Sequence, residues 1–180
     1  MEKKDLEIKL KRLVNESIQE LKNIGLEDKI HSYINFSINY RAKKRLGQCH
    51  RKTDIDISSW LLEIGSNNDI KNTIIHEILH TFDDTIGHKE KWQYYARYVG
   101  NRTNYSITRT ANIKEIYKKA HIEMPHRYEI TCKRCGDAFH QQKMTTRVID
   151  SYIEGRRIHR KCNGTDFKIV DLKKNKIVYQ

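Results

Sequence analysis

TIIHEILHTFDDTIGHKEKW, residues 73–92, contains the pattern HExxH, formed by His76, Glu77 and His80. In a helix this spacing brings two imidazoles one turn apart, with a carboxylate beside them. Imidazoles are common zinc ligands, and a neighbouring glutamate can act as general base in a hydrolysis. The stretch therefore predicts a helix that carries a hydrolytic zinc site.

Hydrophobic periodicity supports the helix. At about 100° per residue, one apolar arc covers roughly half of its circumference. The arc comprises Ile70, Ile74, Ile75, Ile78, Leu79 and Phe82. His76 and His80 lie about 40° apart on the other side, with Glu77 at the edge of the arc. The alternative is that HExxH arose by chance in a charged helix; the separation of the two faces and a third histidine downstream weigh against it.

A catalytic zinc needs a third protein ligand and keeps its fourth position open for water. His88 is the natural candidate, because Gly87 before it permits a turn that would bring the chain back towards the helix. Trp92, four residues further on, is expected to pack behind the site. Asp83 and Asp84 could orient a ligand imidazole, although a solvated helix end explains them equally well.

The segments around this helix indicate a mixed α+β domain. Residues 3–24 have leucines and isoleucines at helical spacing, and residues 33–40 alternate as a strand does. Ile55 and Ile57 predict a second short strand. Helices are expected over residues 69–84, 88–99 and 110–120. An edge strand beside the helix that carries the histidines could pair with an extended peptide substrate.

The C-terminal part contains a second metal pattern. Cys132 and Cys135 form a CxxC knuckle, and His159 and Cys162 form an HxxC pair. Together they predict a closed Cys₃His site, for which zinc is the usual ion, on a zinc ribbon whose 23 intervening residues form a long hairpin. A short polar tail buries little core, so a metal would stabilise it. The alternative is two unrelated thiols at the knuckle plus a distant one. Cys49, outside this pattern, is expected to be a small buried thiol.

Two other histidines are alternative ligands for this second site. His140 and His126 lie nearer to the knuckle in sequence, and His140 is the better placed of the two. Pro125, the single proline, follows the last expected helix and precedes a change of pattern. We therefore expect a metal-binding domain over residues 1–124 and a zinc ribbon over residues 125–180.

Charge is distributed unevenly along the chain. The net charge is +12, and residues 126–180 hold 13 Lys/Arg against 6 Asp/Glu, a net +7. A basic surface favours polyanions, most often DNA or RNA, through contacts with phosphates. A solvated basic surface without a partner is the alternative. Charge alone leaves both interpretations open, and DNA is the expected partner of the C-terminal region only under the first of them.

Composition indicates one modest domain with a small appendage. Of the 180 residues, 37% are hydrophobic, which suffices for one core. No apolar run approaches the roughly 18–20 residues that span a membrane. The charged N-terminal segment lacks the apolar centre of a signal peptide, so a cytoplasmic location without membrane contact is expected. Free or metal-bound cysteines fit that location better than disulfides do.

These motifs resemble those of the SprT-like metalloproteases. HEILH followed by Gly87-His88 matches their ligand pattern, Arg45-Leu-Gly-Gln-Cys49 resembles the strand before their active helix, and Ile55–Leu62 resembles their next strand and turn. Lys89 stands where many members have Gly, and His159 where their ribbon has Cys. The resemblance implies a zincin-like α+β domain followed by a β zinc ribbon, and proteolysis coupled to DNA.

The expected activity is metal-assisted peptide hydrolysis with one catalytic and one structural Zn²⁺. His76, His80 and His88 would bind the catalytic zinc, and Glu77 would be the general base. Tyr105 or Arg109 could stabilise the oxyanion. The main alternative is a zinc-stabilised nucleic-acid-binding or regulatory protein with little or no protease activity. A third possibility is a regulatory protease that cleaves one specific partner protein. The sequence indicates no oligomeric state.

Overall fold

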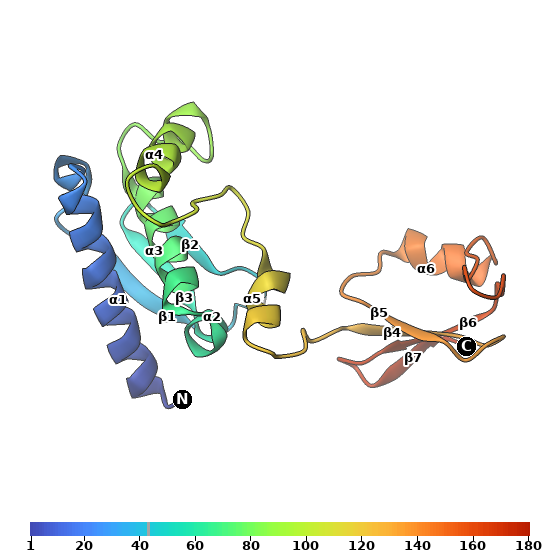
Figure 1. Ribbon diagram of the computed structural model, residues 1–180. Helices are drawn as coiled ribbons and strands as arrows, with labels where there is room; N and C mark the ends of the chain where they lie inside the picture. The colour runs from blue at the N-terminus through green and yellow to red at the C-terminus, as the bar shows by residue number, and fades with distance from the viewer. Residues whose placement is uncertain (43) are drawn as a thin grey trace. The chain divides into compact units, whose positions relative to one another are not determined.

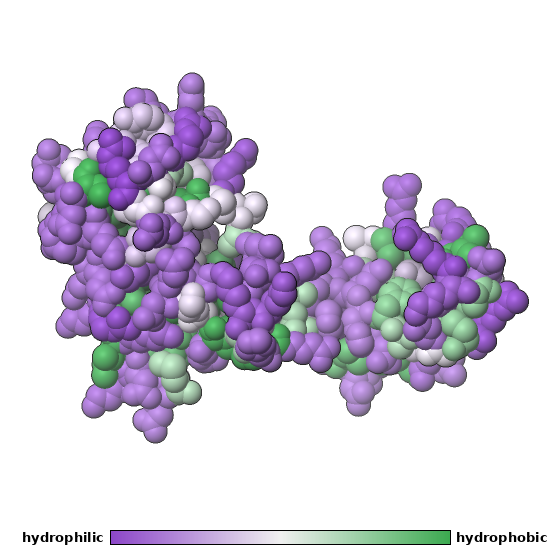
Figure 2. All heavy atoms as spheres, in the orientation of Figure 1, coloured by the Kyte–Doolittle hydropathy of each residue, from purple (hydrophilic) through white to green (hydrophobic). Residues whose placement is uncertain are grey.

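The computed structural model describes residues 1–42 and 44–180, so Lys43, in the basic loop before the RLGQC motif, lies outside the described residues. The chain divides into two compact units, Met1–Ile122 and Glu123–Gln180 (Figure 1). On the face drawn in Figure 2, hydrophilic residues predominate on both units, with hydrophobic residues scattered among them. Among the described residues, no helix has the length and apolar character needed to span a membrane.

The first unit packs helices on a three-stranded sheet. Its elements are α1 (Lys3–Asn23), a 3₁₀ turn (Glu27–Lys29), β1 (Asn35–Asn39), β2 (Gly47–His50), β3 (Asp54–Ser58), α2 (Ser59–Ile64), α3 (Asn67–Thr81), α4 (Glu90–Gly100) and α5 (Ile113–Lys119). The strand order is β1-β3-β2, with β1 parallel and β2 antiparallel to β3. Both β1 and β2 are therefore edge strands of this sheet, and the unit has the mixed α+β architecture that the sequence predicts.

Helix α3 is the central element of this unit. Ser66 and Asp69 form a capping box that satisfies the free amides of its first turn. The predicted apolar arc is fully buried, against α1 and β3 among others. Burying one such isoleucine stabilises the fold by about 1.5–3 kcal/mol. The opposite side of α3 is thereby left for His76 and His80.

The end of α3 differs from the prediction. The helix stops at Thr81 and Phe82 is extended, whereas helical spacing suggested residues 69–84. Polar side chains take up the last carbonyl groups: the Thr85 hydroxyl donates to Leu79 and Phe82, and the His31 ring contacts the Thr81 carbonyl at 2.7 Å. Asp83 and Asp84 consequently lie in a turn.

The second unit is a four-stranded antiparallel sheet with one helix. It comprises β4 (Tyr128–Cys132), β5 (Ala138–Gln141), α6 (Thr146–Ile153), β6 (Phe167–Asp171) and β7 (Lys176–Tyr179), in the order β5-β4-β6-β7 (Figure 1). It has its own small core, which includes Ile130, Tyr152, Phe167 and Ile169. The expectation of one long hairpin between the two ligand pairs is wrong. That segment contains β5 and α6, whose first turn is capped by the Thr145 side chain.

Candidate metal centres

Helix α3 and the loop after it bring three imidazoles together. His76 and His80 project from successive turns of α3, and Gly87 adopts a positive φ of 55° just before His88. The three Nε2 atoms lie 3.3 Å (His76–His80), 3.2 Å (His80–His88) and 3.0 Å (His76–His88) apart. Residues separated by up to 12 positions thus converge on one point.

This triangle has the dimensions of a zinc site. Tetrahedral zinc with Zn–N bonds of about 2.0–2.1 Å separates its nitrogen ligands by about 3.3–3.4 Å. The three observed distances of 3.0–3.3 Å are close to this spacing. Burial, together with the neighbouring imidazoles, lowers the pKa of His76 and of His80 to about 4. Both rings are therefore neutral at pH 7, the form that binds metal.

Neighbouring groups fix the orientation of the imidazoles. The Nδ1 of His76 lies 3.0 Å from the Thr108 carbonyl, which leaves Nε2 for a metal. Trp92 is 1% exposed, and its ring lies 4.6–5.5 Å from the three imidazole centroids. The Gln93 amide donates to the His88 carbonyl. A backbone carbonyl and an indole thus hold the rings in place.

The two aspartates after α3 do not contact the imidazoles. Asp84 accepts a hydrogen bond from Tyr95, and Asp83 lies 3.5 Å from His31. The turn at Phe82 directs both carboxylates away from the triad. Thr108, 32 residues beyond His76, takes the orienting role instead; nothing in the local sequence marks it.

Glu77 is buried beside the histidine triad, with 7% of its surface exposed. Burial raises the pKa of its carboxyl group to about 7, although the Cys49 backbone amide opposes the rise. Glu77 also packs against β2, where a Cβ on Gly47 would lie 3.0 Å from its Cγ. The glycine of the RLGQC motif therefore permits the close approach of β2 to α3.

A cleft of about 510 Å³ opens over these groups. Its lining includes Gly47, Gln48 and Cys49 of β2 and all three histidines. Cys49 is half-buried rather than fully buried, and burial raises the pKa of its thiol to about 11. The cleft thus joins an edge strand, a buried carboxyl group and three metal-binding nitrogens.

The two residues considered for oxyanion stabilisation lie in different surroundings. The Tyr105 hydroxyl donates to Glu20 of α1 at 2.5 Å, and this contact fixes the hydroxyl group. Arg109 is exposed and lines a cavity that includes His76 and Glu77. Arg109 is therefore the one of the two that lies beside the metal centre.

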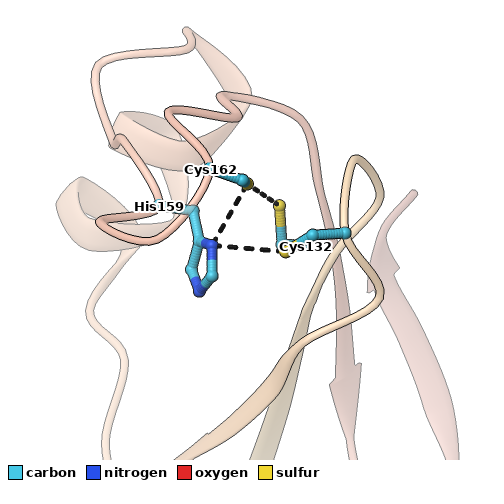
Figure 3. A group of neighbouring side chains, drawn as sticks. Cys132, His159 and Cys162 are labelled. Carbon is cyan, nitrogen blue, oxygen red and sulfur yellow. Dashed lines mark hydrogen bonds between the residues drawn. The ribbon is translucent and has the colours of Figure 1, made fainter.

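A second candidate metal centre lies in the second unit. Cys132 at the end of β4 faces His159 and Cys162, which lie in the loop after α6 (Figure 3). Cys135, in the turn after β4, completes the group. The Sγ atoms of Cys132 and Cys162 are 3.6 Å apart, and the His159 Nδ1 is 3.4 Å from Cys135 Sγ and 3.2 Å from Cys162 Sγ. With Zn–S bonds of about 2.3 Å, a tetrahedral site requires about 3.5–3.8 Å for such pairs. The four donors fit a closed structural site.

Two further contacts shape this centre. The His159 Nε2 lies 3.0 Å from the Asp137 carboxylate, which is also paired with Lys161 at 2.9 Å. This partner leaves Nδ1 for the metal. A Cβ on Gly164 would lie 2.9 Å from Cys132 Sγ, so that only a glycine fits beside the thiolates. Neither Asp137 nor Gly164 is indicated by ligand spacing alone.

The alternative ligands His126 and His140 lie elsewhere in the second unit. Their rings stack at 4.8 Å, and His140 faces Glu129 at 3.5 Å. Neither belongs to the group of Cys132, Cys135, His159 and Cys162, whose donor atoms all lie within 4.8 Å of one another. In the folded chain, His159 is the histidine that faces the thiols.

Comparison with known proteins agrees with this geometry. A search of curated proteins found no match. A sequence profile of the SprT-like family matches residues 14–111, more than half of the chain, and includes α3, the three histidines and Thr108. The chain belongs to the SprT-like family.

Proposed function

We propose that this protein is a zinc-dependent metallopeptidase that cleaves proteins associated with DNA. The observation that carries the proposal is the convergence of three imidazole nitrogens within 3.0–3.3 Å beside the buried carboxyl group of Glu77. A structural zinc site has four protein ligands, whereas this centre offers three and opens into a cleft.

The residues of this centre have different roles in the proposed hydrolysis. His76, His80 and His88 would hold the zinc, which when bound lowers the pKa of water and polarises a carbonyl group. Glu77 takes the proton of the attacking water and returns it to the leaving amine. Burial raises the pKa of this carboxyl group and a bound zinc ion would lower it, so the two effects oppose each other at Glu77.

Strand β2 provides a place for the substrate backbone. It is bonded to β3 on one side only, and Gly47, Gln48 and Cys49 line the cleft. An extended peptide added along this edge would lie over the metal centre, held by main-chain hydrogen bonds with little selection of side chains. Such binding suits a protease that accepts varied proteins.

The second unit supports the DNA part of the proposal. It carries the charge excess of the tail, and its exposed cations include Arg134, Arg147, Arg156, Arg157, Arg160 and Lys161. Thiolates and His159 would bind a structural zinc that stabilises its small core. The cationic residues would then bind phosphates independently of base sequence.

Zinc analysis combined with one substitution tests the proposal. The wild-type protein is expected to bind two zinc ions and to cleave a DNA-bound protein, while Glu77→Gln binds both ions and DNA but no longer cleaves. Glu7→Gln, an exposed change on α1, is the matched control and is expected to cleave like the wild type. Cleavage that survives in Glu77→Gln contradicts the proposed mechanism. No cleavage by the wild type, with zinc and DNA bound, would favour a nucleic-acid-binding protein instead.

A further inference from the structure

A second cavity adjoins the metal centre and the cleft along β2. It has a volume of about 690 Å³ and shares Gly47, His76 and Glu77 with that cleft. Residues 106–113 and α5 form its other walls, and Ile113 and Ile116 contribute apolar surface. A cavity of this size that reaches the general base can hold a substrate side chain next to the bond being cleaved.

The lining of this cavity contains several charged side chains. Among the described residues, Lys44, Arg45, Lys119 and Arg109 line it, against the carboxyl groups of Asp69, Glu77 and Glu115. Several of these groups already have partners. Asp69 is paired with Lys119 at 3.3 Å and accepts from Ser66, and Arg45 lies 3.6 Å from Asp56 outside the cavity.

Arg109 is the cation best placed for a ligand. It is exposed, and within the described part of the chain it forms no hydrogen bond or ion pair with a side chain. It directly follows Thr108, whose carbonyl orients His76. Arg109 lines the same cavity as His76 and Glu77. Among the described residues, the planar guanidinium group therefore offers unpaired donors at the wall of this cavity.

The geometry points to a carboxylate-binding subsite in which Arg109 receives a carboxylate of the peptide substrate beside the scissile bond. This inference rests on the proposed peptidase function and adds a preference to it. Arginine binds a carboxylate through two parallel hydrogen bonds, an interaction well matched to its fixed fork. The carboxylate can come from an Asp or Glu side chain or from the C-terminus of the peptide.

Matched peptides test the subsite and separate the two sources. Peptides that differ only in Glu, Gln or Lys beside the cleavage position, each with a free or an amidated C-terminus, are compared by kcat/KM. We expect the wild type to cleave the Glu peptide about tenfold better than the Gln peptide, and Arg109→Gln to remove this difference. A preference that follows the free C-terminus identifies that carboxylate instead.

Two variants distinguish recognition of a substrate carboxylate from a general effect on the rate of peptide cleavage. Arg109→Glu is expected to favour the Lys peptide, because the charge at the subsite is reversed. Arg97→Gln, an exposed change on α4 away from the cavity, is expected to keep the wild-type preference. If Arg109→Gln slows all the peptides equally, Arg109 stabilises the oxyanion and the subsite is excluded.

A binding measurement keeps the inference testable if no peptide is cleaved. Zinc-loaded Glu77→Gln protein is titrated with the same peptides and with a single-stranded oligonucleotide. Tighter binding of the Glu peptide that disappears in a Glu77→Gln/Arg109→Gln variant supports the subsite even if the peptidase function fails. Equal binding of all the peptides overturns the proposed subsite. So does a result in which Arg109→Gln weakens binding of the oligonucleotide but of none of the peptides.

Discussion

Gly47 lies directly against Glu77, so that a methyl group on the glycine would come within 3.0 Å of the Glu77 Cγ. The same methyl group would lie 3.0 Å from the Thr73 Cγ2 and 3.1 Å from the Asp56 carbonyl. Glu77, the proposed general base, is thus held between its own helix and the sheet edge that lines the cleft. Small changes at Gly47 should therefore affect both packing and catalysis.

Gly47→Ala is expected to destabilise the first unit by about 1–3 kcal/mol, because the added methyl group forces β2 away from α3. Denaturant unfolding measures this loss, and peptide cleavage is expected to fall with it. Thr73→Ser, which removes the nearby methyl group, should restore part of the stability in the double variant. If the effects of Gly47→Ala and Thr73→Ser on the free energy of unfolding are fully additive, the two side chains do not contact each other.

Trp92→Ala is expected to cost about 3–5 kcal/mol in stability and to weaken zinc binding at the histidine triad. The indole contacts all three imidazoles and is almost fully buried. Trp60→Ala is the control: that ring stacks on Tyr117 and contacts none of the three histidines. The zinc affinity of the two variants is compared by competition with a chelator. Equal affinity in both would show that Trp92 does not hold the three imidazoles in place.

Asp137→Asn is expected to weaken zinc binding in the second unit by about 10–100-fold, because the carboxylate orients His159. Zinc at the histidine triad should be unaffected. Asp166→Asn is the matched control, since Asp166 is an exposed partner of Lys133. Unchanged zinc affinity in Asp137→Asn would show that His159 is oriented by the loop alone.

Cys132→Ser is expected to reduce the zinc content from two ions to one and to unfold the second unit. Its core is small and the thiolates supply much of its stability. Limited proteolysis should then degrade residues 123–180 while residues 1–122 persist. A second unit that stays resistant without its zinc would show that its sheet is stable alone.

Cys49 is expected to react slowly with iodoacetamide at pH 8. Burial raises the pKa of its thiol to about 11, so only about one molecule in a thousand is a thiolate at that pH. The rate should rise about tenfold per pH unit up to pH 10, as measured by mass spectrometry of the modified peptide. A rate at pH 8 equal to that of the unfolded chain would contradict this environment.

Much of the first unit follows from local patterns. The periodicity of α1 and α3, the alternation of β1 and the resemblance at the RLGQC motif are all encoded within a few residues, and the structure confirms these elements. Element ends were harder to predict. At the end of α3 the Thr81 carbonyl contacts the ring of His31, which lies 50 residues away, in addition to the local contacts of Thr85. Helix α6 is too short for periodicity to separate it from a loop.

The sequence by itself determined the HExxH and CxxC residues as candidate ligands, because HExxH is read within one helical turn and CxxC within one tight turn. It left His159, His140 and His126 as alternatives, and the folded chain selects His159. Only the tertiary structure decided what surrounds them. Thr108 reaches His76 across 32 residues, Asp137 reaches His159 across 22, and Arg109 comes to line a cavity with Glu77. These contacts join segments that are distant in the chain, and packing of the whole unit selects them, so no local spacing could reveal them.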